Sequence, residues 1–166
     1  MEVPARKEKR LRCRCRVEYR SRFQLEEVTI RIQTNDSGVS WIDVAYLFQS
    51  VGWGEREPEH LHSAFAKSTF KCFAFDGTKL VGFGRTIDDG RYMATVVDVI
   101  VHPAYQRQGI GRQIMQSLQA AMVGFLVTTL TAAPEVQEFY KKLGWRKLKT
   151  GMMLPRSEEQ ARQNCD

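Results

Sequence analysis

The residues with the clearest chemical potential lie where an apolar run gives way to two glycines flanked by arginines, in the stretch 97–112, VDVIVHPAYQRQGIGR. Gly109 and Gly111 let the backbone bend tightly and let a ligand approach without a Cβ in the way. The first amides of a helix have no partner within it and lie at its positive end. With Arg107 and Arg112 beside them, these amides predict a binding site for a pyrophosphate.

Two common phosphate motifs do not fit this stretch. A P-loop requires Lys followed by Ser or Thr after its last glycine, and neither pair follows Gly111. A dinucleotide fingerprint requires a third glycine three residues after the second, and Ile114 occupies that position. The glycines therefore indicate a different phosphate-containing ligand.

Hydrophobic periodicity predicts the elements that must position these residues. Alternating or continuous apolar runs predict strands over 26–34, 69–75, 79–87, 94–101 and 125–131, and a closing hairpin over 145–149 and 152–154. Helical spacing predicts helices from about 39 to 52, and over 58–67, 110–124 and 134–143. Gly82 and Gly84 interrupt one strand, which predicts a close backbone approach there. The order β-α-α-β-β-β-α-β-α-β-β is that of an α/β domain (α+β) with a mixed, partly antiparallel sheet.

Two blocks together resemble the GNAT superfamily of N-acetyltransferases. Residues 106–111, QRQGIG, are similar to its acetyl-CoA motif Gln/Arg-x-x-Gly-x-Gly/Ala, and residues 139–145, FYKKLGW, are similar to its Phe-Tyr-x-x-Leu-Gly-Phe block. A strand, a helix and a second strand are expected between them, as in that family. The resemblance implies the GNAT fold and acetyl-CoA as a co-substrate.

A narrower resemblance concerns the acceptor. Residues 80–86, 88–90 and 98–101 are similar to the plant plastid and cyanobacterial amine acetyltransferases, whose type member acetylates serotonin. This implies a small amine as acceptor, such as an arylalkylamine. The amine of a protein Lys or N-terminus remains the alternative.

The resemblance also implies the site residues. The main chain of Val99, Ile100 and Val101 would pair with the pantetheine arm of acetyl-CoA. The pyrophosphate would be held by Gln106, Arg107, Gln108, Gly109, Ile110, Gly111 and Arg112. Tyr140 would act as the general acid that protonates the departing thiolate, and Asp98 as the base that accepts the amine proton.

Each catalytic assignment has a structural alternative. Tyr140 follows Val136 by one helical turn on an apolar stripe, where a tyrosine can simply pack. Asp98 is the only charge in its strand, and a buried carboxylate without a partner is costly. A structural bond to backbone amides or to Arg85 would explain it equally well. An acceptor pocket lined by aromatic residues, or else a core, is expected from Trp41, Tyr46, Trp53 and Phe73.

The mechanism expected is direct attack in a ternary complex, because no cysteine lies where a covalent carrier would be needed. Two other classes of protein remain open: a non-catalytic acyl-CoA-binding module, and a nucleic-acid binder that uses a basic N-terminal arm. Residues 1–22 hold nine basic and three acidic residues, and so carry the whole net charge of +6. The remaining chain is neutral, which disfavours nucleic acid as a partner.

The domain boundaries expected are a basic leader over 1–24, the acetyltransferase domain over 25–156 and a polar tail over 157–166. No apolar run is long enough to cross a bilayer, and no membrane is expected as a partner. Neither the four cysteines nor the histidines show zinc-ligand spacing, so no metal is expected. The compartment is expected to be the cytoplasm, or a plastid or another organelle if 1–22 is a leader remnant. The chain is expected to be a monomer or a homodimer.

Overall fold

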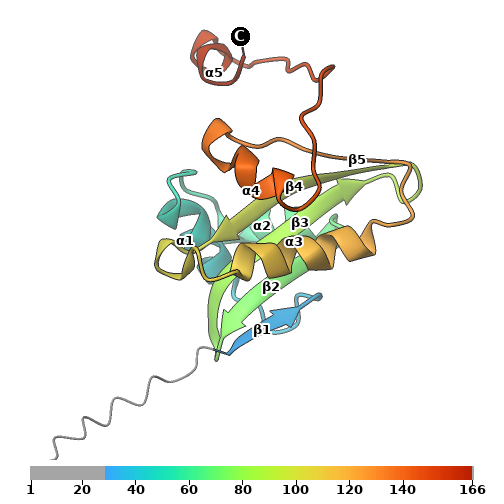
Figure 1. Ribbon diagram of the computed structural model, residues 1–166. Coiled ribbons are helices and arrows are strands. Elements are labelled where there is room, and N and C mark those ends of the chain that lie inside the picture. Colours follow the sequence, from blue (N-terminus) through green and yellow to red (C-terminus); the bar gives the residue numbers. More distant parts are fainter. Residues whose placement is uncertain (1–28, 166) are drawn as a thin grey trace, which may run out of the picture.

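The computed structural model describes residues 29–165, in which five strands form one sheet with helices on both of its faces (Figure 1). The predicted leader, 1–24, lies outside the described residues, as do the first positions of the first predicted strand. The elements are β1 (Ile30–Gln33), α1 (Trp41–Ser50), α2 (Pro58–Ala66), β2 (Lys71–Asp76), β3 (Lys79–Asp88), β4 (Met93–Val101), α3 (Ile110–Ala121), β5 (Val127–Leu130), α4 (Gln137–Lys141) and α5 (Glu158–Asn164), with short 3₁₀ turns η1 (Pro103–Tyr105) and η2 (Pro134–Val136).

The sheet follows chain order, from β1 to β5. The first four strands run antiparallel to their neighbours, whereas β5 runs parallel to β4. The parallel pair needs a crossover connection, and α3 provides it. This arrangement confirms the predicted α/β class with a mixed sheet.

The face of the sheet toward α1 and α2 is filled mainly by aromatic side chains. Phe65 of α2 stacks on Phe73 of β2, with ring centroids 5.8 Å apart, and contacts Phe83 of β3 edge-on at 5.4 Å. All three side chains are fully buried. Burial of each contributes roughly 1.5–3 kcal/mol relative to exposure, so this cluster fixes α2 on the sheet.

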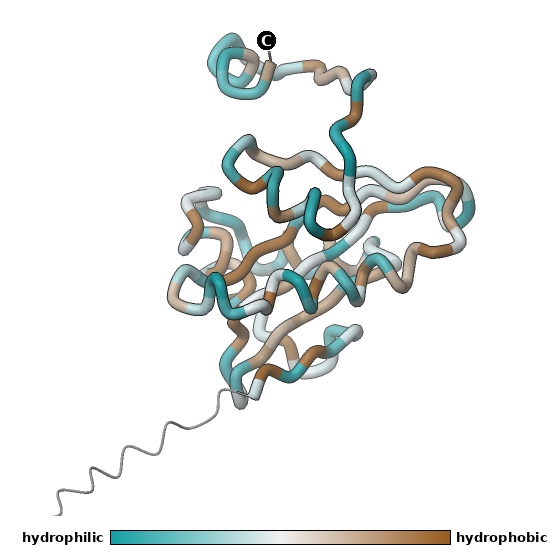
Figure 2. The backbone as a smooth tube through the Cα atoms, viewed as in Figure 1, coloured by the Kyte–Doolittle hydropathy of each residue, from teal (hydrophilic) through white to brown (hydrophobic). Residues whose placement is uncertain are grey.

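The opposite face packs against α3 through two glycines of β3. A Cβ added at Gly84 would lie 2.7 Å from Cγ2 of Ile114, and one at Gly82 would lie 2.8 Å from the carbonyl oxygen of Ile100. No larger residue fits without displacing the helix or the neighbouring strand. The close approach predicted from these glycines is confirmed, and it packs the middle of α3, at Ile114 and Leu118, against β3. Figure 2 shows the apolar residues along the central strands between the two helical layers.

The C-terminal part differs from the prediction. The hairpin expected over 145–149 and 152–154 is wrong, because neither stretch pairs with a strand of the described chain. An alternating sequence becomes a strand only when a neighbour supplies backbone partners, and here the segment leaves the body (Figure 1). The predicted polar tail instead contains α5. Ser157 caps this helix by accepting a hydrogen bond from the amide of Gln160 at 3.2 Å.

The helix expected over 134–143 is shorter than predicted. Pro134 opens the 3₁₀ turn η2, and the α-helical part, α4, covers only Gln137–Lys141. Gly144 follows it with φ of +92°, a conformation that favours glycine and ends the helix as expected. Among residues 29–165, none of the helices combines the length and the apolar character needed to span a bilayer.

Candidate active site

The site begins where β4 loses its parallel neighbour. β4 pairs with β3 as far as Val101, but it pairs with β5 only from Met93 to Val96. Beyond Val96, the edge of β4 that faces β5 is open. This opening is the space in which the family resemblance predicts the pantetheine arm.

Alternate residues of β4 form hydrogen bonds with β3, and the residues between them direct their main-chain groups toward the opening. The amide of His102 donates to the carbonyl of Val81 at 2.8 Å. Pairs alternate along an antiparallel ladder, so Ile100 exchanges its hydrogen bonds with Phe83. The N–H and C=O groups of Val99 and Val101 therefore point to the open side. Of the three residues predicted to pair with pantetheine, Val99 can offer its N–H and C=O groups and Val101 its N–H, because the carbonyl of Val101 already accepts a hydrogen bond from the side chain of Gln106. Ile100 supplies a buried side chain.

The loop after β4 is braced by two glutamines from the predicted motif. The side-chain amide of Gln106 donates to the carbonyl of Val101 at 3.0 Å, and that of Gln108 donates to the carbonyl of Ala104 at 3.1 Å. Tyr105 donates its hydroxyl to Asp76 at 2.9 Å and so ties the loop to the end of β2. These side chains hold the loop in shape, which leaves its amides as the groups that can meet a ligand.

The backbone of this loop is unusual at two positions. Gly109 has φ of +84°, and Arg107 has φ of +61°, which makes it the only residue other than glycine with a positive φ in the described chain. A left-handed conformation costs a non-glycine residue roughly 1–2 kcal/mol. Such strain clusters at ligand sites, and alternating left- and right-handed residues turn successive amides toward one point.

These amides fit a pyrophosphate. Gly109 is the N-cap of α3 and has no side chain to satisfy the first amides of the helix, which belong to Ile110, Gly111 and Arg112. The helix is 12 residues long, so its N-terminus carries a substantial positive dipole. Arg107 and Arg112 add formal positive charge. An anion would satisfy donors that the described chain leaves without a cap.

The second motif block packs onto the first. Cζ of Phe139 lies 3.5 Å from the position of a Cβ on Gly111, and a methyl group of Val101 lies 3.7 Å from it. The next residue, Tyr140, is half-buried against the core on the α3 face of the sheet. Desolvation by burial raises the pKa of the Tyr140 phenol. The side chain is thus kept protonated, as a general acid must be.

Asp98 is an ion-paired carboxylate. Oδ2 of Asp98 lies 2.5 Å from Nε of Arg85, and both side chains are only 15% exposed. Nη1 of Arg85 also donates to the hydroxyl of Ser68 at 3.2 Å, and the guanidinium lies 5.1 Å from the ring centroid of Phe65. The structural partner considered from the sequence, Arg85, is therefore present, and it fixes the orientation of the carboxylate.

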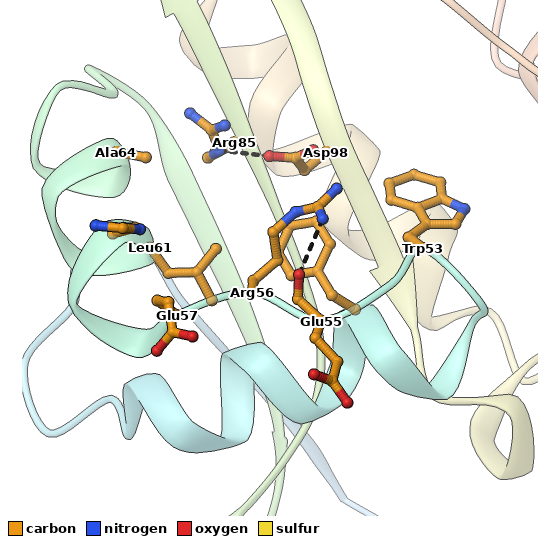
Figure 3. Close-up of a pocket in the computed structure, with 10 residues that line it drawn as sticks. Trp53, Glu55, Arg56, Glu57, Leu61, Ala64, Arg85 and Asp98 are labelled. Carbon is orange, nitrogen blue, oxygen red and sulfur yellow. Dashed lines mark hydrogen bonds and ion pairs between the residues drawn. The ribbon is translucent and has the colours of Figure 1, made fainter. Parts of the chain in front are cut away.

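A cleft of about 530 Å³ opens over this ion pair on the face of the sheet that carries α1 and α2 (Figure 3). The loop between the two helices supplies charged and aromatic walls. The cleft is lined by Asp98 and Arg85 together with Phe48, Trp53, Glu55, Arg56, Glu57 and His60. Asp98 thus faces this cleft, while Tyr140 packs on the opposite face, with the open edge of β4 between the two layers.

Of the four aromatic residues expected to line an acceptor pocket, only Trp53 does so. Phe73 is fully buried, and Trp41 packs edge-on against Phe65 at 5.2 Å in the same core. Tyr46 is exposed on α1 and stacks on His102 at 5.9 Å. Sequence reasoning missed the lining residues of 55–60, EREPEH, although a dense run of charges before a helix was the available signal.

The described residues give little support for a metal site or for a cysteine nucleophile. Within 29–165 there is no group of three or more His, Cys, Asp or Glu side chains that could hold a metal ion. Cys72 is buried, and burial raises the pKa of its thiol. A buried thiol of this kind is a poor nucleophile.

Comparisons with known proteins agree with this geometry. Residues 30–152 match the acetyltransferase (GNAT) domain family. The chain is 31% identical to the N-acetyltransferase ycf52 of Porphyra purpurea, over 76% of this chain and 74% of that protein. It is 33% identical to serotonin N-acetyltransferase 2, chloroplastic, of Oryza sativa subsp. japonica, over 60% of this chain and 52% of that protein. The solved GNAT family acetyltransferase of Streptococcus pneumoniae TIGR4 has a TM-score of 0.68 and 32% identity, and the match covers 78% of this chain and all of that one.

Proposed function

Because the chain belongs to the acetyltransferase (GNAT) family, and is by that membership an N-acetyltransferase, we propose that it transfers the acetyl group of acetyl-CoA to a primary amine. Acetyl-CoA is supported as the donor by the open edge of β4. This edge leads directly to the start of α3, where Gly109 is the N-cap. An extended arm with a pyrophosphate at one end has the shape that such a site accommodates.

In this proposal the donor lies along Val99 and Val101. The outward N–H and C=O groups of Val99 and the N–H of Val101 pair with the amide groups of pantetheine as an added strand would. The pyrophosphate accepts hydrogen bonds from the amides at the start of α3, with Arg107 and Arg112 beside it. The thioester then lies in the opening between the cleft and the α3 layer.

The reaction is a direct acyl transfer. The amine nitrogen attacks the thioester carbonyl, forms the C–N bond and expels CoA as the C–S bond breaks. Asp98 accepts the proton that the amine loses, directly or through a water molecule, and Tyr140 donates a proton to the departing sulfur. The Arg85–Asp98 pair holds the base in place, and much of the acceleration comes from positioning the two substrates.

The lining of the cleft favours a cationic amine with an aromatic body. The carboxylates of Glu55, Glu57 and Asp98 outnumber the guanidinium groups of Arg56 and Arg85 in this lining, and the excess negative charge favours an ammonium group. Phe48 and Trp53 offer ring surfaces for stacking. The name of the rice relative, a serotonin N-acetyltransferase, supports the same class of acceptor. We therefore place an arylalkylamine ahead of the amine of a protein Lys or N-terminus.

The chloroplastic designation of that relative also favours a plastid over the cytoplasm as the compartment. The full chain fused at its C-terminus to a fluorescent protein tests this choice. Fluorescence that coincides with a plastid marker supports it, and diffuse cytoplasmic fluorescence contradicts it.

The test of the proposed function has two arms. Calorimetry of the purified full chain with CoA measures donor binding independently of any acceptor. Incubation with acetyl-CoA and a panel of arylalkylamines, aliphatic amines, a lysine peptide and a peptide with a free N-terminus, followed by mass spectrometry, identifies the acceptor. We expect an acetylated arylalkylamine as the main product. Absence of CoA binding overturns the proposal, whereas a main product from a peptide overturns only the acceptor class.

A further inference from the structure

His102 lies at the junction between β4 and the loop that we propose binds phosphate. It follows Val101, the last residue of β4, and its amide donates to the carbonyl of Val81 in β3 at 2.8 Å. Any residue except proline can make a backbone bond of this kind, so the bond gives no reason for a histidine at this position. The reason lies in the contacts of the side chain.

The side chain of His102 caps the short turn η1 that follows it. Nδ1 accepts a hydrogen bond from the amide of Ala104 at 3.2 Å, and the carbonyl of His102 accepts one from the amide of Tyr105 at 2.8 Å. Pro103 has no amide to satisfy. The amide of Gln106, the next residue, donates to the carbonyl of Pro103 at 3.3 Å. His102 therefore accepts from both amides of the turn.

The amides that follow this turn have no partner. Within the part of the chain that the structure describes, the amides of Arg107, Gln108 and Gly109 donate to no other group. The change from satisfied to free amides thus occurs directly after the turn that His102 caps. Successive amides bind an anion only when they converge on one point, so the conformation of the turn determines where these amides are directed.

The ring of His102 is itself held by two other rings. It stacks on Tyr46 of α1 with the centroids 5.9 Å apart and an interplanar angle of 26°, and it lies edge-on to Tyr105 at 5.9 Å. Tyr105 is fixed in turn by its hydrogen bond to Asp76 and by Nζ of Lys79, which lies 5.2 Å from its ring centroid. These contacts restrict rotation of the imidazole and keep Nδ1 directed at the turn.

We propose that His102 is a positioning residue for the donor, which sets the conformation of η1 and so directs the free amides from Arg107 onward to the pyrophosphate. This inference rests on the proposed function, because it requires that the loop binds the phosphates of acetyl-CoA. His102 acts through the backbone of the loop, since its Nδ1 is occupied by the amide of Ala104. Its loss should weaken the binding of the phosphates and leave the transfer step unchanged.

The first test is the affinity of the full chain for CoA, measured by calorimetry. His102→Ala should raise the Kd by about three- to tenfold, the effect expected for loss of a cap. His102→Asn should restore most of the affinity, because an asparagine side chain also accepts from the amide two residues on. His62→Ala is the matched control and should keep the wild-type Kd. His62 also packs on an aromatic ring of α1, that of Trp41 at 5.0 Å, but it belongs to α2 rather than to the loop.

The second test uses a donor without phosphates, S-acetylpantetheine, with the acceptor that the amine panel identifies. His102→Ala should raise the KM for acetyl-CoA by the same factor as the Kd of CoA and leave kcat near the wild-type value. The kcat/KM for S-acetylpantetheine should be the same in the variant and the wild type. An equal loss with both donors would overturn the proposal, because it would show that His102 supports the site as a whole.

The third test follows the loop without any ligand, by hydrogen exchange and mass spectrometry. The amides of 104–106 should exchange faster in His102→Ala than in the wild type, and at the wild-type rate in His102→Asn and His62→Ala. The proposal is overturned if His102→Ala keeps both the exchange rate and the Kd of the wild type, or if His102→Asn loses as much affinity as His102→Ala. A wild-type chain that binds no CoA would overturn the proposed function instead, and hydrogen exchange would still decide whether His102 holds the turn.

Discussion

The ring of Phe139 lies against Gly111, with its Cζ 3.5 Å from the position that a Cβ on the glycine would occupy. Through this contact α4 is held at the N-terminus of α3, although the two motifs are far apart in the sequence. Tyr140 follows Phe139 and is therefore placed relative to the amides that we propose bind phosphate. Substitutions in either motif should for this reason have separable effects on cofactor affinity and on turnover.

The two motif glycines should differ in their tolerance of alanine. Gly109 has φ of +84°, so Gly109→Ala strains the loop by roughly 1–2 kcal/mol and should raise the dissociation constant of CoA by about tenfold. At Gly111 a Cβ would meet Phe139 at an ordinary contact distance, so Gly111→Ala should bind CoA nearly as tightly as the wild type. Calorimetry with CoA measures both, with circular dichroism as the control for folding. Equal losses would show that the backbone conformation of Gly109 is not what the ligand requires.

Tyr140→Phe should separate chemistry from binding. Loss of a general acid typically costs about 10²-fold or more in kcat, while the affinity for CoA should stay unchanged because the ring is kept. Burial raises the pKa of Tyr140, so the phenol of the wild type stays protonated beyond its ordinary range. The kcat of the wild type should therefore decline only at a pH above the ordinary pKa of a tyrosine. In the phenylalanine variant this alkaline decline should be absent. A variant with wild-type kcat would assign Tyr140 to packing alone.

The pair formed by Arg85 and Asp98 allows structure and catalysis to be distinguished. Asp98→Asn and Arg85→Gln each leave a largely buried partner without its counter-ion, and each should lower the free energy of unfolding by about 1–3 kcal/mol. The double variant should lose less than the sum of the two. Urea unfolding measures these changes.

Turnover of the same variants gives the second readout. If Asp98 accepts the proton, the double variant recovers part of its stability but stays as slow as Asp98→Asn. Recovery of kcat in the double variant would instead show that the carboxylate serves only to neutralise Arg85.

The fold could be predicted where the hydrophobic pattern of a segment agrees with the packing that the segment finds in the folded chain. β3 and β4 follow from apolar runs bounded by turn residues, and the glycines at 82 and 84 indicated the close approach of α3. The hairpin over 145–149 and 152–154 failed because strand formation depends on a partner. Periodicity records which side chains share a face, but it does not record whether another backbone is within reach.

The site was predictable to a similar degree. The backbone geometry of the loop proposed to bind phosphate could be predicted because its requirements are local, namely a positive φ at Gly109 and uncapped amides after it. The partner of Asp98 was among the alternatives, since a charge inside a strand calls for one. The cleft walls were not found, because convergence of Glu55 and His60 on Asp98 depends on how the loop between α1 and α2 folds over the sheet. Tertiary packing alone determines which charged loop residues meet.

An ion pair away from the site should make the free energy of unfolding depend on pH in the acidic range. Nζ of Lys71 lies 2.9 Å from Oδ2 of Asp36 and lowers the pKa of that carboxyl. The unfolded chain therefore binds this proton more readily, so the contribution of Asp36 is complete at neutral pH and is lost as pH falls from about 4 through the lowered pKa. Because Asp36 is partly exposed, Lys71→Met should cost no more than about 1 kcal/mol at neutral pH, and this difference should shrink below about pH 3. Urea unfolding across this range measures it, with Lys67→Met, at the exposed residue that follows α2, as the control. A loss for Lys71→Met that is the same at every pH would show that Lys71 acts through its hydrogen bond to the carbonyl of Phe65 rather than through Asp36.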